Sequence, residues 1–332
     1  MKAAVIGSGA WGTALAIRLC RNGHDVTLWV RDADRATRMA RTRRNPRLPG
    51  AELPQGLQFS ASFDCVRDCA LVVMATPSFP IRATAAAVAP WLNPDTVLAC
   101  VTKGLEADTH LRMSQVVSQV TGRDVVALTG PSHAEEVALD MPTGLLAACQ
   151  DQEKAEFVQN AFMADCLRVY TSPDPVGAEL GGALKNVIAL CAGITDGLGC
   201  GDNTKAMLMT RGLTETARLG VALGAKKETF AGLAGVGDLI VTCTSMHSRN
   251  RRAGILIGQG KDAQTAMEEV GAVVEGYYAT KSAYELGKAK GIDMPITEAA
   301  YQVLYLGADV RDTFLGLMNR QKKAESEDAG WL

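Results

Sequence analysis

The segment from Ala4 to Gly12 constrains the fold of this chain more than any other. A short apolar run leads directly into Gly7-Ser8-Gly9-Ala10-Trp11-Gly12, and a helical pattern begins at Thr13. In this order the first glycine allows a tight turn, the second lets the backbone approach a pyrophosphate, and the third lets a helix pack closely on a strand. The helix N-terminus then offers free N–H groups to the anion. We therefore expect a dinucleotide site at the start of the chain; a plain turn is the alternative.

The residue that ends the next apolar run bears on which dinucleotide is bound. Residues 25–30 are expected to form the second strand, which ends at Arg31. An NAD-preferring site usually has an acidic residue here for the ribose 2′-OH, whereas this chain has Arg31 followed by Asp32. Arginine suits a 2′-phosphate through its charge and its bidentate geometry. We expect NADP(H) to be preferred, with NAD(H) possible; the alternative is that Arg31 opens a solvated basic stretch.

Composition excludes several classes of partner. The chain has 332 residues and a net charge of −2, so nothing in the overall charge directs it to nucleic acid. It contains no run of about 18 apolar residues, so no membrane span is expected. The nine cysteines are scattered without a Cys-x-x-Cys pair, which disfavours zinc and a disulfide framework. Reduced thiols fit a cytoplasmic location, and no metal site is expected.

The apolar patterns predict an α/β fold with two domains. In the first half, apolar runs alternate with helical patterns, which predicts a doubly wound, mostly parallel Rossmann-type sheet. From about residue 173 long helical segments dominate, so we expect a dinucleotide-binding domain over 1–172 and an all-helical substrate and catalytic domain over 173–332. Strands are expected at 2–7, 25–30, 71–75, 96–102, 125–129, 144–149 and 167–170, and helices of the second domain at 175–196, 204–223, 248–258, 263–270, 275–288 and 296–306.

Polar residues follow two of the expected strands. Lys103 comes directly after the run 96–102. In an open α/β sheet the carboxyl ends of the strands face the ligand crevice, so Lys103 is expected to point toward cofactor and substrate. A solvated surface lysine is an equally good interpretation of this residue alone.

The segment after residues 125–129 repeats this arrangement. Gly130 allows a tight turn, and Ser132 is expected to cap the next helix, with Glu135 as its capping-box partner. His133 is expected to be mainly an exposed residue of the first helical turn. A catalytic role for His133 is the less favoured alternative.

Two glycines interrupt the helical pattern around Lys185. Gly181 and Gly182 each cost about 1 kcal/mol relative to alanine, which makes sense if a backbone or a ligand approaches closely there. Gly182, Lys185 and Asn186 share one helix face. Because the flanking residues are apolar, Lys185 is expected to be buried, where a lysine needs a partner or a lowered pKa. That environment suits a general acid/base; a snorkelling lysine is the alternative.

A last group of polar residues lies between residues 235 and 251. Asp238 follows a glycine-rich stretch and is either a turn residue or a partner that orients Lys185. Ser248 is a candidate N-cap, and Arg249 and Asn250 at the same helix start are suited to holding a phosphate. Simple capping with solvated arginines is the alternative.

Taken together, these motifs closely resemble those of the bacterial NAD(P)-dependent glycerol-3-phosphate dehydrogenases. They occur in the family's order and cover nearly the whole chain. One departure is Ala10, which stands where many members have serine. The matching segments are 7–12, 102–104, 130–132, 184–186, 235–238 and 248–250.

The resemblance implies an enzyme that interconverts dihydroxyacetone phosphate and sn-glycerol 3-phosphate for phospholipid synthesis. It implies that Lys185 is the acid/base residue, assisted by Lys103 and Asp238. It places the substrate against Lys103, Gly130, Ser132, Lys185, Asp238, Ser248, Arg249 and Asn250. It places the cofactor against Gly7, Gly9, Ala10, Trp11, Gly12, Arg31, Lys103, Ala134, Arg249, Val274 and Glu275.

Two other functions stay open at this point. A 3-hydroxyacid or 6-phosphogluconate dehydrogenase also places lysine and asparagine on a helix after a Rossmann domain, although the segment 248–250 favours a small phosphorylated substrate. A non-catalytic NADPH sensor has no reason to combine Lys103, Lys185 and Asp238. A homodimer is expected from symmetry and from the resemblance.

Overall fold

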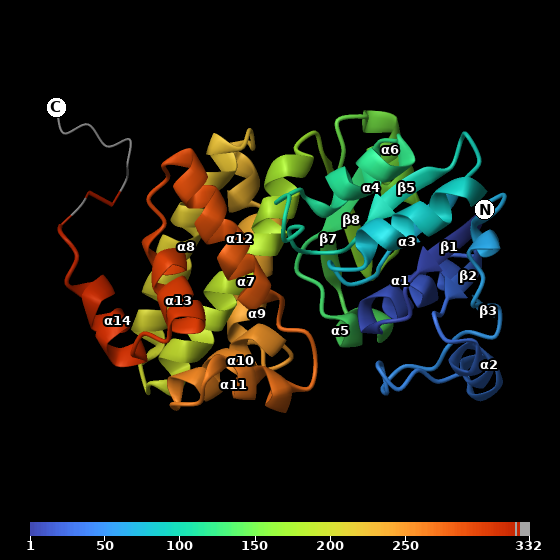
Figure 1. Ribbon diagram of the computed structural model, residues 1–332. Helices are drawn as coiled ribbons and strands as arrows, with labels where there is room; N and C mark the ends of the chain where they lie inside the picture. Colours follow the sequence, from blue (N-terminus) through green and yellow to red (C-terminus); the bar gives the residue numbers. More distant parts are fainter. Residues whose placement is uncertain (323, 326–332) are drawn as a thin grey trace.

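The computed structural model describes residues 1–322, 324 and 325, and Figure 1 shows a sheet-based half beside a helical half. The first half is built around one sheet of eight strands. The strands are β1 (Lys2–Ile6), β2 (Asp25–Trp29), β3 (Gln58–Ser60), β4 (Leu71–Met74), β5 (Val97–Cys100), β6 (Val125–Thr129), β7 (Thr143–Ala148) and β8 (Leu167–Ser172).

The strand order is that of a doubly wound sheet. It runs β3-β2-β1-β4-β5-β6-β7-β8, and neighbouring strands are parallel except β6 and β7, which pair antiparallel. The predicted fold class is therefore confirmed. Because the order reverses between β1 and β4, the loops after these strands diverge and open a crevice at the carboxyl edge of the sheet.

Helices cover both faces of the sheet. Alternate residues of β1 divide between two hydrophobic clusters: Ala3 and Val5 pack with one set of helices, Ala4 and Ile6 with the other. All four side chains are fully buried, as expected for a strand covered on both sides. The first face carries α1 (Ala10–Arg21), α5 (Ala134–Ala138) and α6 (Gln152–Phe162), and the second carries α3 (Ile81–Val88) and α4 (Met113–Thr121).

Two elements of this half were not predicted from the sequence. The strand β3 has only three residues and lies at the edge of the sheet, too short for a recognisable alternation. The helix α2 (Ala33–Thr42) occupies the basic stretch after Arg31, and only Ala36 and Met39 in it are buried. Asp32, which precedes it, accepts a hydrogen bond from the backbone N–H of Arg35 as its N-cap.

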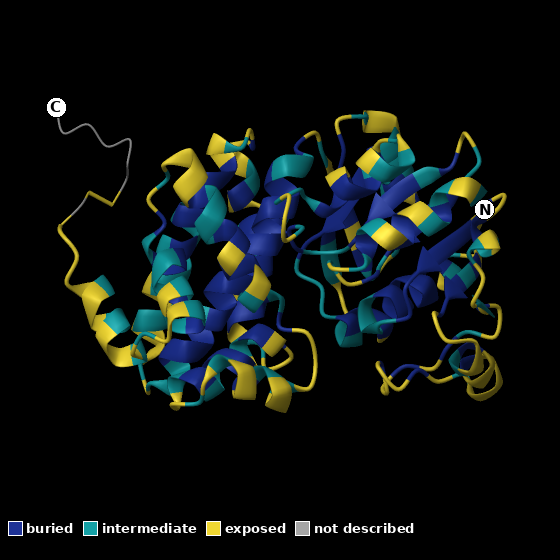
Figure 2. Cartoon of the chain, viewed as in Figure 1, coloured by how far each residue is buried: buried dark blue, intermediate teal, exposed yellow. Residues whose placement is uncertain are grey.

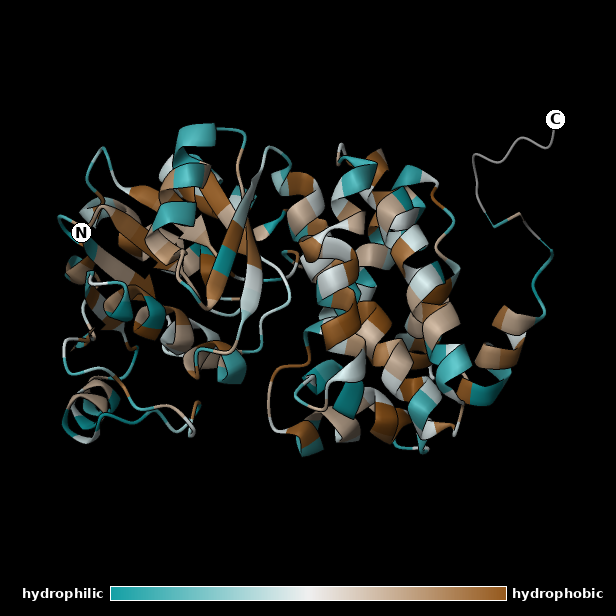
Figure 3. Ribbon diagram, turned by 180° about the vertical axis from the view of Figure 1, so that it is seen from behind, coloured by the Kyte–Doolittle hydropathy of each residue, from teal (hydrophilic) through white to brown (hydrophobic). Residues whose placement is uncertain are grey.

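The helical half is organised around one buried helix, α7, which Figure 2 shows in dark blue over most of its length. It is long and apolar enough to cross a membrane by composition, but 89% of the relevant window is buried inside the protein, as in a core helix. The helices are α7 (Pro175–Gly197), α8 (Asp202–Ala222), α9 (Asp238–Thr244), α10 (Arg249–Gly258), α11 (Ala263–Val270), α12 (Glu275–Lys290), α13 (Pro295–Leu306) and α14 (Val310–Met318). Figure 3 shows apolar residues along the sheet strands and along the inner helices.

Glycines allow α7 and α10 to pack backbone against backbone. A Cβ at Gly193 would lie 2.1 Å from the carbonyl oxygen of Arg251, and one at Gly254 would lie 2.1 Å from that of Leu190. Neither helix could hold its position with a larger residue there. This close crossing fixes the start of α10 relative to the middle of α7, where Lys185 lies.

The C-terminal helix α14 was not predicted. None of its residues is buried, although Val310, Phe314, Leu317 and Met318 have helical spacing and line one cavity. The last strand ends at Ser172 and α7 begins at Pro175, while the division of the chain at 172/173 stays a prediction. Residues 323 and 326–332 of the expected second domain lie outside the described residues.

Candidate active site

Three charged side chains from distant parts of the chain meet between the two domains. Lys185 of α7 donates from Nζ to Asp238 Oδ1 and, at 2.7 Å, to Thr242 Oγ1. Lys103, in the loop after β5, donates from Nζ to Asp238 Oδ2 at 2.6 Å and to the carbonyl oxygen of Gly130 at 3.1 Å. One carboxylate thus bridges two ammonium groups, so the cluster carries one net positive charge when both lysines are protonated and Asp238 is ionised.

Burial tunes the acidity of Lys185. The residue is 7% exposed and Asp238 is fully buried, whereas the side chain of Lys103 is 20% exposed. Burial lowers the pKa of Lys185 to about 7; the carboxylate of Asp238 opposes this shift and the ammonium of Lys103 adds to it. A lysine with a pKa near neutrality can both release and accept a proton at physiological pH.

The two glycines before Lys185 bring the other two charges to it. A Cβ at Gly181 would lie 2.4 Å from the carbonyl oxygen of Ala234, in a π-helical turn that runs directly into Asp238 at the start of α9. A Cβ at Gly182 would lie 2.9 Å from Thr129 Oγ1 and 3.7 Å from Cδ of Lys103. The close approach expected from the sequence is therefore present. Asp238 is a helical residue that contacts Lys185, and the alternative of a turn residue is wrong.

The glycine loop has the geometry that a dinucleotide requires. Gly7 has φ +132°, and a Cβ there would lie 2.5 Å from the carbonyl oxygen of Ala75. A Cβ at Gly12 would lie 2.0 Å from the carbonyl oxygen of Gly7, so the third glycine allows α1 to pack against the strand. At Gly9, the N-cap of α1, a Cβ would have no atom of the described residues within 4 Å apart from its immediate neighbours in the chain, so the backbone there is open to a ligand.

A buried network behind the loop was missed at the sequence level. Asn45 is fully buried, and its Nδ2 donates to Thr13 Oγ1 at 2.7 Å and to the carbonyl oxygen of Ser8 at 3.2 Å. Arg35 also donates to the carbonyl oxygen of Ser8, at 2.9 Å. These contacts fix the loop from below. They depend on a long irregular segment that returns to α1, which no local pattern reveals.

A second chain of hydrogen bonds links three helices beside Lys185. Asn250 of α10 donates to Asn186 Oδ1 at 2.9 Å and accepts from the backbone N–H of Gly276 at 2.8 Å. The next residue back, Glu275, accepts from Ser78 Oγ in the loop after β4 at 3.0 Å. The predicted residues Asn250 and Glu275 are therefore linked to the centre of the site. Ser78, like Thr242, was missed, because each is a common hydroxyl residue without a motif.

Other predicted residues surround this centre. Ser248 caps α10 by accepting from the backbone N–H of Arg251 at 3.2 Å, and Arg249 is exposed at the same helix start. Arg31 is exposed after β2. Ala134 and Val274 have side chains in hydrophobic clusters, so only their backbone atoms can face a cofactor. Ala10 and Trp11 are partly buried in the first turn of α1.

The expected cap of α5 is wrong. Ser132 Oγ instead donates to the carbonyl oxygen of Gly130 at 3.0 Å, and His133 occupies the N-cap position without a side-chain capping bond. The carbonyl oxygen of Gly130 therefore accepts hydrogen bonds from both Ser132 Oγ and Lys103 Nζ. His133 is half-buried rather than exposed, because its ring meets His247 of the other domain.

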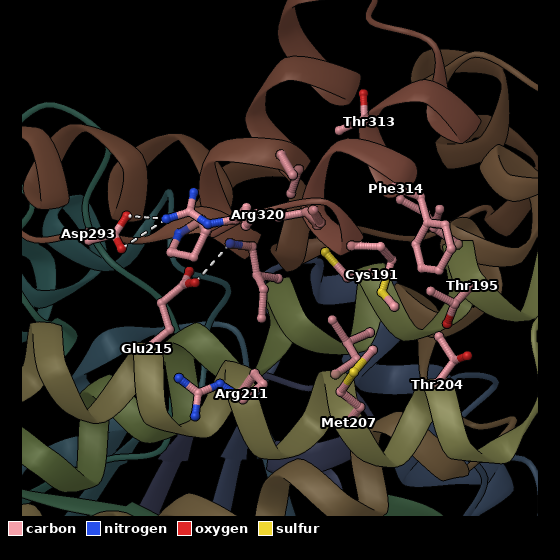
Figure 4. A pocket seen from close by; sticks show the side chains of 18 of the residues that line it. Cys191, Thr195, Thr204, Met207, Arg211, Glu215, Asp293, Thr313, Phe314 and Arg320 are labelled. Atoms are coloured by element: carbon pink, nitrogen blue, oxygen red, sulfur yellow. Dashed lines mark hydrogen bonds and ion pairs between the residues drawn. The ribbon is translucent and has the colours of Figure 1, made fainter. Parts of the chain in front are cut away.

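A cavity of about 470 Å³ lies apart from this cluster, between α8, α13 and α14 (Figure 4). Its buried carboxylate, Glu215, accepts from the backbone N–H groups of Ile296 and Thr297, both at 2.8 Å. Glu215 therefore caps α13. None of the residues predicted for the site lines this cavity.

The fold and the charged cluster together define a class of protein. A glycine loop on a Rossmann-type sheet faces a helical domain, and that domain supplies a buried lysine with a lowered pKa. This combination is expected of a two-domain nicotinamide-dependent dehydrogenase.

Comparisons with known proteins specify the family. Residues 2–155 and 174–314 match the N-terminal and C-terminal sequence models of NAD-dependent glycerol-3-phosphate dehydrogenase. A glycerol-3-phosphate dehydrogenase (NAD(P)+) of Desulfitobacterium hafniense is 50% identical over 100% of this chain and 95% of its own length. One of Moorella thermoacetica is 51% identical over 99% and 98%. The crystal structure of the glycerol-3-phosphate dehydrogenase of Coxiella burnetii has a TM-score of 0.91 and 35% identity, covering 96% of this chain and 99% of that one.

The chain therefore belongs to the NAD-dependent glycerol-3-phosphate dehydrogenase family. The predicted family and the predicted oxidoreductase class are confirmed. Dependence on NAD(P) follows at the level of the family, and the hydroxyacid dehydrogenase and sensor alternatives are set aside.

Proposed function

We propose that this enzyme interconverts dihydroxyacetone phosphate and sn-glycerol 3-phosphate, with Lys185 as general acid/base, and supplies glycerol 3-phosphate for phospholipid synthesis. The observation that carries the proposal is the buried carboxylate of Asp238 shared by Lys185 and Lys103. The cluster lies where the carboxyl ends of β5 and β6 meet α7. A ketone placed there contacts groups of both domains.

The described residues fit a nicotinamide dinucleotide. Gly7, Gly9 and Gly12 supply the turn and the open backbone, and Ala10 and Trp11 present further N–H groups in the same helical turn. Thr76 Oγ1, at the end of β4, is buried without a hydrogen-bond partner among the described residues, as expected of a group that faces a ligand. When bound, the reduced nicotinamide supplies the hydride that converts the ketone to an alcohol.

The protein residues manage the charge that develops on the carbonyl oxygen. In the reductive direction the ammonium of Lys185 donates a proton to that oxygen, while Lys103 stabilises its negative charge. Asp238 holds both lysines in place, and the hydroxyl of Thr242 accepts one of the remaining N–H groups of Lys185. In the oxidative direction neutral Lys185 removes the proton from the alcohol. A pKa of about 7 allows both roles.

The substrate phosphate is proposed to lie at the start of α10. Ser248, Arg249 and Asn250 combine a helix N-terminus, a guanidinium and an amide there. The guanidinium of Arg249 also interacts with the carboxyl group of Glu275. Burial raises the pKa of Glu275, while the hydrogen bond from the Ser78 hydroxyl and the charge of Arg249 oppose this shift. Holding the phosphate at this point fixes the ketone near Lys185, to which Asn250 is linked through Asn186.

We propose that NADP(H) is preferred to NAD(H), because a basic cluster surrounds the end of β2. The pKa of Arg35 is lowered by burial and by the like charges of Arg47, Arg38 and Arg31, with only Asp32 opposing them. A 2′-phosphate would relieve this repulsion, whereas a ribose hydroxyl would not. The ratio of kcat/KM with NADPH to that with NADH tests this preference.

The test of the proposed reaction is the nicotinamide absorbance of purified enzyme mixed with reduced cofactor. We expect oxidation of the cofactor that depends on dihydroxyacetone phosphate and does not occur with 3-keto acids or with the unphosphorylated sugar acids at the same concentration. Tight binding of cofactor without such turnover would refute the proposal. The homodimer and the cytoplasmic location are kept as proposals, and light scattering on the purified protein tests the first.

A further inference from the structure

Two histidines face one another across the boundary between the domains. His133 stands at the N-cap of α5 in the sheet domain, and His247 lies in the loop that precedes α10 in the helical domain. Their ring centroids are 5.5 Å apart, with an interplanar angle of 51°. Because the two rings come from different domains, they can act together only on something held between those domains.

The ring of His133 has a polar atom available for a ligand. Its Nε2 is buried and has no hydrogen-bond partner among the described residues. A buried donor or acceptor without a partner is costly, so such an atom in a crevice indicates a group that a ligand satisfies. Burial, Lys185 and His247 lower the pKa of His133, while Glu136 on its own helix and the backbone of Val241 raise it.

The sequence neighbours of both rings belong to the proposed substrate site. Ser132, directly before His133, bonds to the carbonyl oxygen that also accepts from Lys103. Ser248, directly after His247, caps α10 at the proposed phosphate position. The two imidazoles therefore stand on opposite sides of the domain boundary, beside residues of the proposed substrate site, and Nε2 of His133 has no hydrogen-bond partner among the described residues.

We propose that His133 and His247 bind the phosphate of the three-carbon substrate from both sides of the domain boundary, as a pair of imidazole N–H donors. The proposal rests on the proposed function and adds a contact to it. A phosphate dianion suits two adjacent imidazoles, because it accepts hydrogen bonds from their N–H groups and its charge offsets their mutual repulsion when both rings are protonated.

The chain contains only four histidines, which makes a direct spectroscopic test possible. Imidazole NMR signals of the full-length enzyme are titrated with pH, with and without saturating glycerol 3-phosphate, and assigned with the variants His133→Gln and His247→Gln. We expect glycerol 3-phosphate to raise the pKa of both His133 and His247 and to leave His24 and His110 unchanged. Unchanged titration of His133 and His247 in an enzyme that turns over would overturn the inference and leave the proposed function intact.

A kinetic test separates phosphate binding from a merely structural role. In His133→Gln and His247→Gln we expect KM for dihydroxyacetone phosphate to rise about tenfold to a hundredfold, with kcat within about twofold of the parent. The slow reduction of dihydroxyacetone, which lacks the phosphate, is expected to be unaffected. His110→Gln, whose ring lies 3.4 Å from Glu285, is the matched control. Equal losses with both substrates would contradict a phosphate contact and indicate a structural role.

Discussion

Replacing Lys185 with methionine removes the proposed acid/base group while preserving the packing around it. The methionine side chain fills a similar volume in a site that is 7% exposed. Asp238 keeps an ammonium partner, because Lys103 still lies 2.6 Å from Oδ2, so the variant leaves no unpaired buried charge. We expect Lys185→Met to fold and to bind cofactor normally, with kcat lowered about a hundredfold or more, a loss of about 3 kcal/mol or more of transition-state stabilisation.

The assay is the rate of reduced-cofactor oxidation at saturating dihydroxyacetone phosphate, compared with cofactor affinity from quenching of protein fluorescence. Lys281→Met is the matched control, since the Lys281 side chain is 54% exposed on α12, away from the charged cluster. Turnover of Lys185→Met within a few-fold of the parent enzyme would refute the role of Lys185. Loss of cofactor binding in the same variant would instead show that the residue supports the fold of the site.

Three further predictions follow from other contacts. Lys103→Met removes a like charge that lowers the pKa of Lys185, so the pH midpoint of the residual activity is expected to move upward; a downward shift in the pH–rate profile would contradict this. Gly254→Ala is expected to cost about 1–3 kcal/mol of unfolding free energy in chemical denaturation, because α7 and α10 must separate. Gly316→Ala, in open space on α14, is expected to stabilise the protein by up to about 1 kcal/mol, and equal effects of the two would disprove the close-packing argument. Arg31→Ser is expected to raise KM for NADPH about tenfold and to leave KM for NADH nearly unchanged, which steady-state kinetics with the two cofactors checks.

The sequence was sufficient to predict the parts of the site that rest on local patterns. The glycine loop, the parallel sheet and the helical second half all follow from periodicity and glycine spacing. The two glycines before Lys185 also correctly predicted that other parts of the chain approach this helix closely, because two glycines in a helix interior are otherwise unfavourable. Ser248 was correctly predicted as the cap of α10.

The parts that could not be predicted depend on residues far apart in the chain. Asn45 supports the glycine loop from a segment without regular structure, and the role of Thr242 depends on the direction of α9 after a π-helical turn. The cap of α5 was wrong because Ser132 bonds backward to Gly130 instead of forward into the helix. Local patterns cannot distinguish these two directions for a serine.

The pH dependence of kcat in both directions of the reaction tests the account most directly, because one group is proposed to donate the proton in reduction and to accept it in oxidation. With a pKa of about 7 for Lys185, reduction of dihydroxyacetone phosphate is expected to slow as pH rises through about 7, and oxidation of glycerol 3-phosphate to slow as pH falls through the same region. Parallel profiles in the two directions, or profiles that are flat across neutral pH, would contradict the assignment of Lys185 as the acid/base residue.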